Sequence, residues 1–368
     1  MKLITFIQKE TVLCIASLLA IISAFAVPPS IAYIEYVDFR VLALLFCLML
    51  VVAGFHMLGL FENIIEKMIK HINSTRQLVF TLVLICFFTS MFITNDVALI
   101  TFVPFAIMIL KKIKKEKLMI FVIVMQTIAA NLGSMFTPLG NPQNLYLYSI
   151  SHMDILEFLE LMFPVTVVSL LLIIVTLLYM KNEEIETIEG IKSVNINRVQ
   201  MNIFVVLFGI CLCAVLHIID YKIALVIVMI TVLICNRKLL AEADYLLLLT
   251  FVAFFIFVGN MKNIPFVVNE LASIVSGNEI IVSTIVSQVI SNVPAAILLS
   301  GFTRNHAMLI LGTNIGGLGT LIASMASLIS YKFYGKTEGA RKGKYLAVFS
   351  VINVIYLFII LVVCIIFV

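Results

Sequence analysis

One stretch of this chain, residues 90–145, restricts the possible folds more than any other. It begins with Ser-Met-Phe-Ile-Thr-Asn-Asp, and apolar sequence flanks it on both sides. It contains Asp96, the one carboxylate that lies far from every boundary of an apolar segment, and three of the eight prolines, Pro104, Pro138 and Pro142. A bilayer tolerates interrupted backbone and an ionisable group only where protein or a water-filled cavity receives them. We therefore expect the functional site in this stretch.

The composition is that of a protein that crosses a membrane several times. Of the 368 residues, 63% are hydrophobic and 12% are charged, and the mean hydropathy is +1.19. A soluble domain is about 25% charged. The length fits about ten segments of roughly 20 residues each. We predict an all-α polytopic protein of the inner (plasma) membrane with about ten membrane-crossing or re-entrant segments.

The sequence lacks the motifs of enzymes and metal sites. Its seven cysteines lie in apolar stretches without a CxxC pair, which argues against a disulfide framework or a metal cage. No HExxH, P-loop or GxSxG pattern occurs, so we expect no enzymatic activity, no cofactor and no nucleic-acid partner. Because no ATP-binding motif is present, a partner ATPase is neither shown nor excluded.

The distribution of basic residues predicts which loops face the cytoplasm. When the apolar segments are followed in order, 20 of the 24 Lys and Arg fall in loops on one side, which is then the cytoplasmic side. The other four, Arg40, Lys222, Lys262 and Arg304, fall outside. This map predicts a cytoplasmic N-terminus and an external C-terminus. The basic cluster 111–117 is interpreted as a topology anchor, with binding of anionic membrane lipid as the alternative.

The same map divides the chain into two halves of one membrane domain. The first half, residues 1–180, contains two short apolar arms that form an inward-opening hairpin over 77–110. The second half, residues 199–368, contains an outward-opening hairpin over 280–302, and a polar cytoplasmic linker, 181–198, separates the halves. Each half also has an apolar crossing interrupted by small and polar residues, over 118–151 and 307–330.

The two halves repeat one another in sequence. Ser90 and Asn95 of the first hairpin match Ser287 and Asn292 of the second at identical spacing. The interrupted crossings match in the same way, counted from Asn131 in the first and Asn314 in the second. The matched pairs are Gly133 with Gly316, Ser134 with Gly317, Thr137 with Thr320, Asn141 with Ser324, and Asn144 with Ser327. Each half thus contains a hairpin and an interrupted crossing, and the two hairpins open to opposite faces of the membrane. This arrangement predicts an inverted-topology repeat with a binding site at the membrane midplane.

Hairpin tips and unwound helices leave backbone groups free to bind ions. Half-helix N-termini offer N–H donors to an anion, and freed carbonyls with Asn and Thr side chains can coordinate Na⁺. A charged Asp96 at the bilayer centre costs about 2.5–3.5 kcal/mol, which a bound cation, a proton or hydrogen bonds must offset. Asp96 is therefore either a coupling-ion ligand or proton carrier, or a carboxylate that caps the second arm. His56 is interpreted as an interior histidine, with a role in the site as the alternative.

Four ordered motifs, at 94–98, 131–144, 291–294 and 314–320, resemble those of the ion-transporter superfamily. That group comprises arsenical-pump membrane proteins, citrate-transporter-like permeases and divalent-anion/sodium symporters. The length and motif order are most similar to those of the short YbiR-type bacterial permeases. The third tip positions are Asp96 and Val293, where the dicarboxylate branch has Thr, so the first tip looks more like the arsenical-pump branch.

The resemblance implies two inverted repeats, each with a hairpin and an unwound helix, often in a homodimer. It also implies substrate between the two hairpin tips and cations beside the unwound segments. With the repeat, it predicts a substrate-binding set of Thr94, Asn95, Ser291, Asn292, Pro294, Asn141, Asn144 and Ser324. The predicted cation-binding set is Asn95, Asp96, Asn131, Gly133, Ser134, Thr137, Asn292, Asn314, Gly316, Gly317 and Thr320.

The predicted function is secondary active transport of a small anion, either a carboxylate, an inorganic anion or an arsenite-type oxyacid. Na⁺ or H⁺ would be the coupling ion, with no metal beyond Na⁺, and one bundle would move against the other in alternating access. A Na⁺/H⁺ antiporter of the same superfamily is the alternative. A channel is a weaker one, because two hairpins on opposite faces argue against a continuous pore. An intramembrane hydrolase built on Asp96 would lack a second buried carboxylate or a nucleophile–base pair.

Overall fold

The structure is a computed structural model that describes residues 10–69, 72–185 and 197–367. Over these ranges the chain is helical, and its one β contact is an isolated antiparallel bridge between Ser74 and Glu184. The all-α prediction is therefore confirmed for the described part of the chain.

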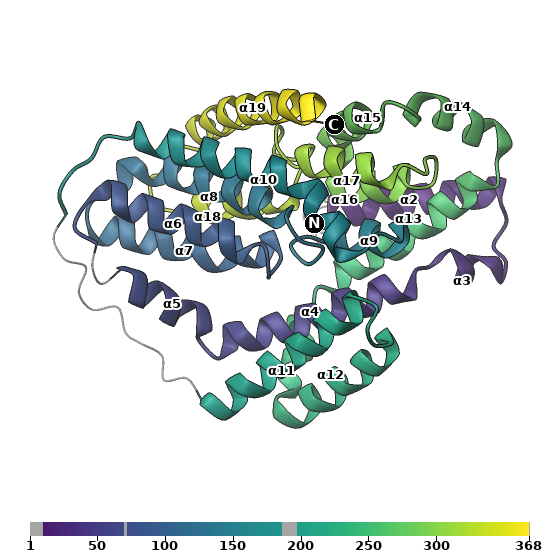
Figure 1. Ribbon diagram of the computed structural model, residues 1–368, viewed down its shortest axis with the longest axis horizontal. Coiled ribbons are helices and arrows are strands. Elements are labelled where there is room, and N and C mark those ends of the chain that lie inside the picture. The colour runs from purple at the N-terminus through teal and green to yellow at the C-terminus, as the bar shows by residue number, and fades with distance from the viewer. Residues whose placement is uncertain (1–9, 70–71, 186–196, 368) are drawn as a thin grey trace.

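The first half builds a bundle of helices that lie side by side on the left of Figure 1. The bundle contains α6 (Thr75–Thr89), α7 (Asn95–Lys112), the 3₁₀ turn η1 (Glu116–Leu118), α8 (Met119–Ser134) and α10 (Ile155–Leu178). Helix α8 packs against α6, α7 and α10, and every residue from 122 to 134 is buried. After a break, the chain continues as the short helix α9 (Pro142–Ser151). The predicted interruption of this crossing is thus present.

The second half contains a similar set of elements. They are α15 (Glu279–Ile290), α16 (Asn292–Leu299), α17 (His306–Ile315), α18 (Met325–Gly335) and α19 (Lys342–Phe367). Helices α17 and α18 are the two parts of the second interrupted crossing. Helix α18 packs against α7 and α8, and α19 packs against α8 and α10, so the two halves share one interior.

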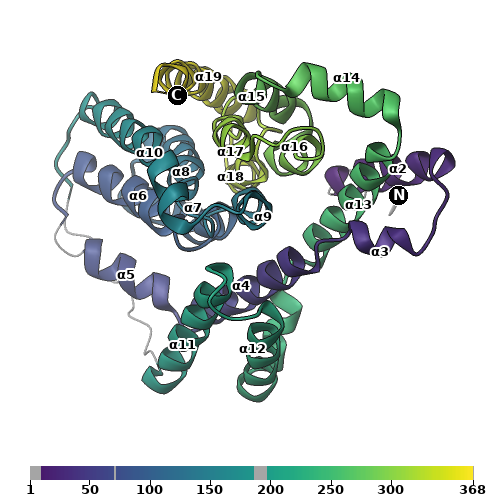
Figure 2. The same cartoon turned by 45° about the vertical axis from the view of Figure 1, so that its right-hand side comes forward.

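The remaining helices form a separate layer, seen below and to the right in Figure 2. This layer contains α2 (Thr11–Ala26), α3 (Ala32–Tyr36), α4 (Phe39–Met57), α11 (Arg198–Val215), α12 (Tyr221–Cys235), the 3₁₀ helix η2 (Arg237–Glu242) and α13 (Tyr245–Lys262). Helices α11 and α12 pair with each other beside α4, and α2 packs along α13. The chain leaves this layer through α5 (Leu60–Ile69) and α14 (Pro265–Val275).

Acidic side chains define where several of these helices begin. Asp38, Asp220 and Asp244 each accept a backbone N–H from the first turn of α4, α12 and α13 respectively. At α10, Asp154 and Glu157 form a reciprocal capping box. An N-cap of this type satisfies an otherwise unpaired N–H donor, which is worth roughly 1 kcal/mol. The carboxylates of Asp38, Asp154, Asp220 and Asp244 are therefore hydrogen-bonded to the N-termini of helices.

Six helices among the described residues are long and apolar enough to cross a membrane. They are α4, the segment from η1 through α8, α10, α11, α13 and α19. A seventh span arises if α14 and α15, which bend by 110° at their junction, are counted as one. A multi-pass membrane protein is confirmed, whereas the count of about ten segments stays a prediction because it includes the short hairpin arms and broken helices.

A set of contacts ties the mouth of the first hairpin to the end of α10. Arg76 Nη2 donates to Met180 O at 2.8 Å, and Thr75 N donates to Glu183 O at 2.8 Å. The Glu183 carboxylate pairs with Lys115 Nζ at 2.5 Å, and this pair keeps the pKa of Glu183 below its ordinary value. Of the predicted linker 181–198, residues 186–196 lie outside the described part of the chain.

Candidate functional site

The two hairpin tips are built by the same backbone contacts. In the first, α6 ends at Thr89 and α7 begins at Asn95, which donates its N–H to Gly140 O at 3.0 Å. In the second, α15 ends at Ile290 and Asn292 donates its N–H to Ala323 O at 2.9 Å. Gly140 and Ala323 each lie nine residues after the first asparagine of their interrupted crossing. Each tip therefore docks on the equivalent point of its own broken helix.

Each tip asparagine also organises the first turn of the second arm. Asn95 Oδ1 accepts the N–H of Asp96 at 3.0 Å, and Asn292 Oδ1 accepts the N–H of Val293 at 2.9 Å. Ser291 precedes Asn292 with a φ of +77°, a backbone conformation rarely adopted by residues other than glycine. Ser291 and Pro294, both predicted to contact substrate, are buried at this second tip.

The threonines of the broken helices fasten the loops to the hairpins. Thr137 Oγ1 donates to Met91 O, and Thr320 Oγ1 donates to Gln288 O at 3.0 Å. Met91 and Gln288 each lie four residues before their tip asparagine. Both hydroxyls are thus used as loop anchors.

Two glycines allow the hairpins to approach the broken helices closely. A Cβ atom at Gly133 would lie 2.0 Å from Phe87 O and 2.6 Å from Ser90 Oγ. At Gly316 it would lie 2.7 Å from Ser287 Oγ. Ser90 and Ser287 are equivalent positions of the two hairpins, so the predicted cation-binding glycines serve the helix contact itself.

The two broken helices meet through reciprocal hydrogen bonds at the centre of the molecule. Asn131 Oδ1 accepts from Ser324 Oγ at 3.0 Å, and Asn314 Oδ1 accepts from Asn141 Nδ2 at 3.0 Å. Ser324 and Asn141 lie ten residues after Asn314 and Asn131, respectively, so each helix binds the same position of the other.

Further contacts join these residues into one buried group, which we call the asparagine cluster. Asn95 Nδ2 donates to Asn131 Oδ1 at 2.9 Å, and Asn314 Nδ2 donates to Asn144 Oδ1 at 2.5 Å. The first crossing also bonds to the backbone of the second, because Asn131 Nδ2 donates to Gly317 O at 3.4 Å. Each member is at most 5% exposed, and the members are Asn95, Asn131, Asn141, Asn144, Asn314 and Ser324.

The predicted cation-binding residues do not all join this cluster. Ser134 reaches it, since its hydroxyl accepts from Asn141 Nδ2 at 3.3 Å. Asn292 lies beside Gly317, where a Cβ atom would be 2.9 Å from Asn292 Nδ2. Thr320 is exposed and points to the hairpin backbone, away from the cluster.

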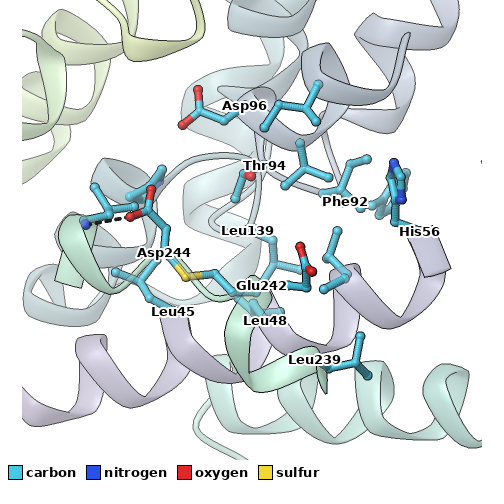
Figure 3. Close-up of a pocket in the computed structure, with 18 of the residues that line it drawn as sticks. Leu45, Leu48, His56, Phe92, Thr94, Asp96, Leu139, Leu239, Glu242 and Asp244 are labelled. Carbon is cyan, nitrogen blue, oxygen red and sulfur yellow. Dashed lines mark hydrogen bonds between the residues drawn. The ribbon is translucent and has the colours of Figure 1, made fainter. Parts of the chain in front are cut away.

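A cavity of about 640 Å³ lies between the asparagine cluster and the layer of α4, η2 and α13. Figure 3 shows Thr94 and Asp96 on one side of it, and Glu242, Asp244 and Leu48 on the other. Its walls are mainly apolar, from α4, α7 and the loop before α9. Asn141 belongs both to the cavity wall and to the asparagine cluster, and so connects them.

The Asp96 carboxylate faces this cavity from the first turn of α7. Within the described residues no hydrogen bond or ion pair reaches it, and the side-chain oxygen that bonds the first turn of α7 is Asn95 Oδ1. Asp96 therefore does not serve as the helix cap considered from the sequence. The Asp96 carboxylate interacts electrostatically with the carboxylate of Asp244, which belongs to the opposite layer.

Sequence patterns did not predict the residues on the far wall of the cavity. They are Asn236, Lys238, Glu242 and Asp244, and His56 lines the cavity with them. In sequence the four look like an ordinary polar loop between two spans, and only the packing of η2 on α4 brings them opposite Asp96. Among the described residues no group of three or more His, Cys, Asp and Glu side chains is arranged to hold a metal ion.

Comparison with known proteins identifies the family and several relatives of this chain. The citrate transporter family matches residues 3–307. The uncharacterized transporter MJ0456 of Methanocaldococcus jannaschii is 31% identical over 299 residues, which are 78% of this chain and 79% of that protein. The inner membrane protein YbiR of Escherichia coli is 30% identical over 305 residues, 80% of each chain.

A more distant relative is the mouse P protein, which is 29% identical over 149 residues, 39% of this chain and 18% of that protein. The predicted resemblance to citrate-transporter-like and YbiR-type permeases is confirmed. The family and its named relatives are transporters, so this chain is a membrane transporter and not an enzyme. Matched over most of its length, the chain belongs to the citrate transporter family.

Proposed function

We propose that this protein is a secondary active transporter that moves a small anion across the inner membrane together with Na⁺ or H⁺. The observation that carries the proposal is the reciprocal pairing of Asn131 with Ser324 and of Asn314 with Asn141. Equivalent residues of the two halves make equivalent contacts at the tips, in the loops and at this centre. Such pairing supports two inverted-topology repeats around one midplane site.

The chemistry of the centre suits an oxyanion with a coupling cation. The Asn95 and Asn131 amides each use one N–H inside the asparagine cluster, so a second N–H of each can donate to a carboxylate or oxyacid oxygen. The positive N-terminal ends of α7 and α16 favour a negative charge beside the two tips. In its charged form, Asp96 at the cavity wall would repel an anion that arrived alone. A Na⁺ ion or proton bound with the anion offsets that repulsion, which is a physical reason for coupling. Citrate, named in the family description, is the first candidate cargo.

The cavity supports alternating access between two bodies. One wall belongs to the first hairpin and its broken helix, and the other belongs to α4, η2 and α13. Movement of these bodies past one another would expose the tips first to one side of the membrane and then to the other.

One observation favours a second candidate, a Na⁺/H⁺ antiporter without an anion substrate. Among the described residues, the cavity is lined by the carboxylates of Asp96, Glu242 and Asp244 and by one lysine, Lys238. An acidic cavity of this kind attracts cations more readily than anions.

Thermal unfolding of the purified protein tests the proposal. We would measure it with citrate, phosphate or arsenite, with and without Na⁺, at pH 5.5 and 8.0. A ligand at 100 times its Kd stabilises the folded state by about 2.7 kcal/mol. We expect one anion to stabilise the protein in a manner that depends on Na⁺ or on pH.

Asp96→Asn should remove that dependence on Na⁺ or pH. Glu116→Gln, an exposed carboxylate-to-amide change at a residue that does not line the cavity, should keep it. Stabilisation by Na⁺ alone, with no effect of any anion, would contradict anion transport and support the antiporter.

A further inference from the structure

A group of basic side chains converges at the far ends of the helices that carry the asparagine cluster. His152 follows the last residue of α9, His306 begins α17, and Lys262 ends α13. Arg40 lies in the first turn of α4, and His217 lies just beyond the end of α11. We call Arg40, His152, His217, Lys262 and His306 the basic cluster. The positive-inside rule assigns the loops that carry it to the outer face.

Contacts and charge–charge interactions link the members of the basic cluster. Arg40 Nη2 donates to Ala214 O at 2.7 Å, which brings it to the end of α11 beside His217. His217 interacts electrostatically with both Arg40 and His152, and its ring lies 6.1 Å from that of Tyr148. His306 interacts with both His152 and Lys262. Helix α9 packs against α17, and α4 packs against α9, α11 and α13, so the helix ends that carry the five residues lie on one face of the protein.

The acids nearest to this cluster cap helix ends rather than pair with it in the described part of the chain. No ion pair to any of its members occurs among the described residues. The acids of the same loops, Asp38, Asp154 and Asp220, accept hydrogen bonds from the N-terminal turns of α4, α10 and α12. Arg40 Nε is buried with no hydrogen-bond partner, which leaves a guanidinium donor unsatisfied. Such a donor is normally paired or solvated, so it points to a missing acceptor.

Burial lowers the pKa of two histidines of the cluster, His217 and His306, from its ordinary value. Burial, the Arg40 guanidinium and His152 all lower the pKa of His217 from its ordinary value. An anion seated among these groups would reverse that effect, because opposite charge favours the protonated imidazole. The cluster should therefore bind an anion more tightly as the pH falls.

Two helices lead from the basic cluster to the asparagine cluster. Helix α9 runs from Pro142, beside Asn141, to the residue before His152. Helix α17 runs from His306 to the residue after Asn314. Ten helical residues span about 15 Å, so the two clusters lie at opposite ends of the same short helices.

We propose that the basic cluster is a binding site for a small soluble polyanion carrying carboxylate or phosphate oxygens, which receives the cargo on the face opposite the Asp96 cavity. Binding at the cluster follows from its own residues, whereas its role in receiving cargo rests on the proposed transport function. Guanidinium, ammonium and imidazolium groups together match the several oxygens of such an anion.

The test is an NMR titration of the full-length protein with isotope-labelled histidine, with and without inorganic phosphate or citrate. We expect the resonances of His152, His217 and His306 to shift. The titration midpoints of His217 and His306 should rise by about half a pH unit, a threefold preference for the protonated form. The His56 resonance is followed separately, because His56 lines the Asp96 cavity and reports on anion binding there rather than at the basic cluster.

Two lysine variants decide whether the cluster is the site. Lys262→Gln should remove the response at His306, and Lys222→Gln, an exposed lysine over the Tyr221 ring, should leave it intact. The proposal is overturned if the three histidines do not respond, if Lys262→Gln responds like the wild type, or if only phosphatidylglycerol elicits the response. Asp96→Asn should leave the response unchanged, so a failure of transport and a failure of this site are separate results.

Discussion

Asn131 of one broken helix and Ser324 of the other are joined by a 3.0 Å hydrogen bond, and Asn314 and Asn141 repeat that bond with the partners exchanged. The two contacts tie together segments that lie about half the chain apart. They place the asparagine cluster at the one point where both halves, both loops and the first hairpin tip meet. Removal of any member should therefore disturb the hydrogen bonds of the whole asparagine cluster.

Asn131→Ala should destabilise the protein strongly. Asn131 Oδ1 accepts from both Asn95 Nδ2 and Ser324 Oγ, so its loss leaves two buried donors unsatisfied. Each such donor costs about 1–3 kcal/mol. Thermal and denaturant unfolding in detergent would measure the change. Ser327→Ala is the matched control, because the Ser327 hydroxyl is equally buried and has no hydrogen-bond partner to lose. Equal effects of the two variants would contradict the assigned role of Asn131.

Gly133→Ala should prevent the first hairpin from docking on α8. The added Cβ would lie 2.0 Å from the Phe87 carbonyl oxygen, and relieving this clash would require the backbone of α6 or α8 to move. Gly209→Ala should instead stabilise the protein, because nothing lies within 4 Å of its Cβ position in α11. A mid-helix Gly→Ala change in open space stabilises by roughly 0.5–1 kcal/mol. Expression level and unfolding temperature of the two variants would be compared, and a tolerated Gly133→Ala would rule out the close approach.

The contact between Lys115 and Glu183 should stabilise the hairpin mouth only above acidic pH. The folded-state pKa of Glu183 is depressed by its hydrogen bond to Lys115, so its contribution is present above the unfolded pKa and disappears as pH falls through the folded value. Glu183→Gln should lower stability slightly at pH 7 and not at all near pH 3, and added salt should shrink the difference. Glu184→Gln provides the comparison. A Glu183 effect that persists at pH 3 would show that the charge is not its cause.

Lys238 should influence the affinity for an anion at the cavity. It is the one lysine that lines the cavity in the described part of the chain, and it lies on the layer opposite Asp96. Lys238→Gln should weaken anion-dependent stabilisation several-fold, while Na⁺-dependent stabilisation should stay the same or increase, because a positive charge repels the cation. Lys336→Gln, an exposed lysine near the end of α18, is the control. If anion affinity is unchanged in Lys238→Gln, the anion does not occupy this wall.

The sequence was sufficient to locate the residues that repeat. The spacing shared by Asn131 and Asn314 identified both interrupted crossings, and the structure breaks α8 from α9 and α17 from α18 within those limits. The sequence did not show that Thr137 and Thr320 anchor the loops, because a threonine beside a helix break gives the same sequence pattern whether it binds an ion or a backbone carbonyl.

The far wall of the cavity shows why the rest of the site could not be predicted from the sequence. Glu242 and Asp244 form no periodic pattern, and Asp244 reads simply as the N-cap of the following span. They face Asp96 only because η2 folds back against α4, a long-range contact that no local spacing encodes. The inverted repeat itself, the membrane orientation of the termini and the homodimer remain predictions of the sequence.

The most direct test of the central claim is coupled flux in proteoliposomes. Labelled citrate, phosphate and arsenite would each be offered with an imposed Na⁺ gradient, an imposed pH gradient, or neither. We predict that one of them accumulates above its external concentration only when a gradient is present, and that Asp96→Asn abolishes this accumulation while Glu116→Gln preserves it. Uptake that merely equilibrates without regard to either gradient, or that is unaltered in Asp96→Asn, would contradict the account.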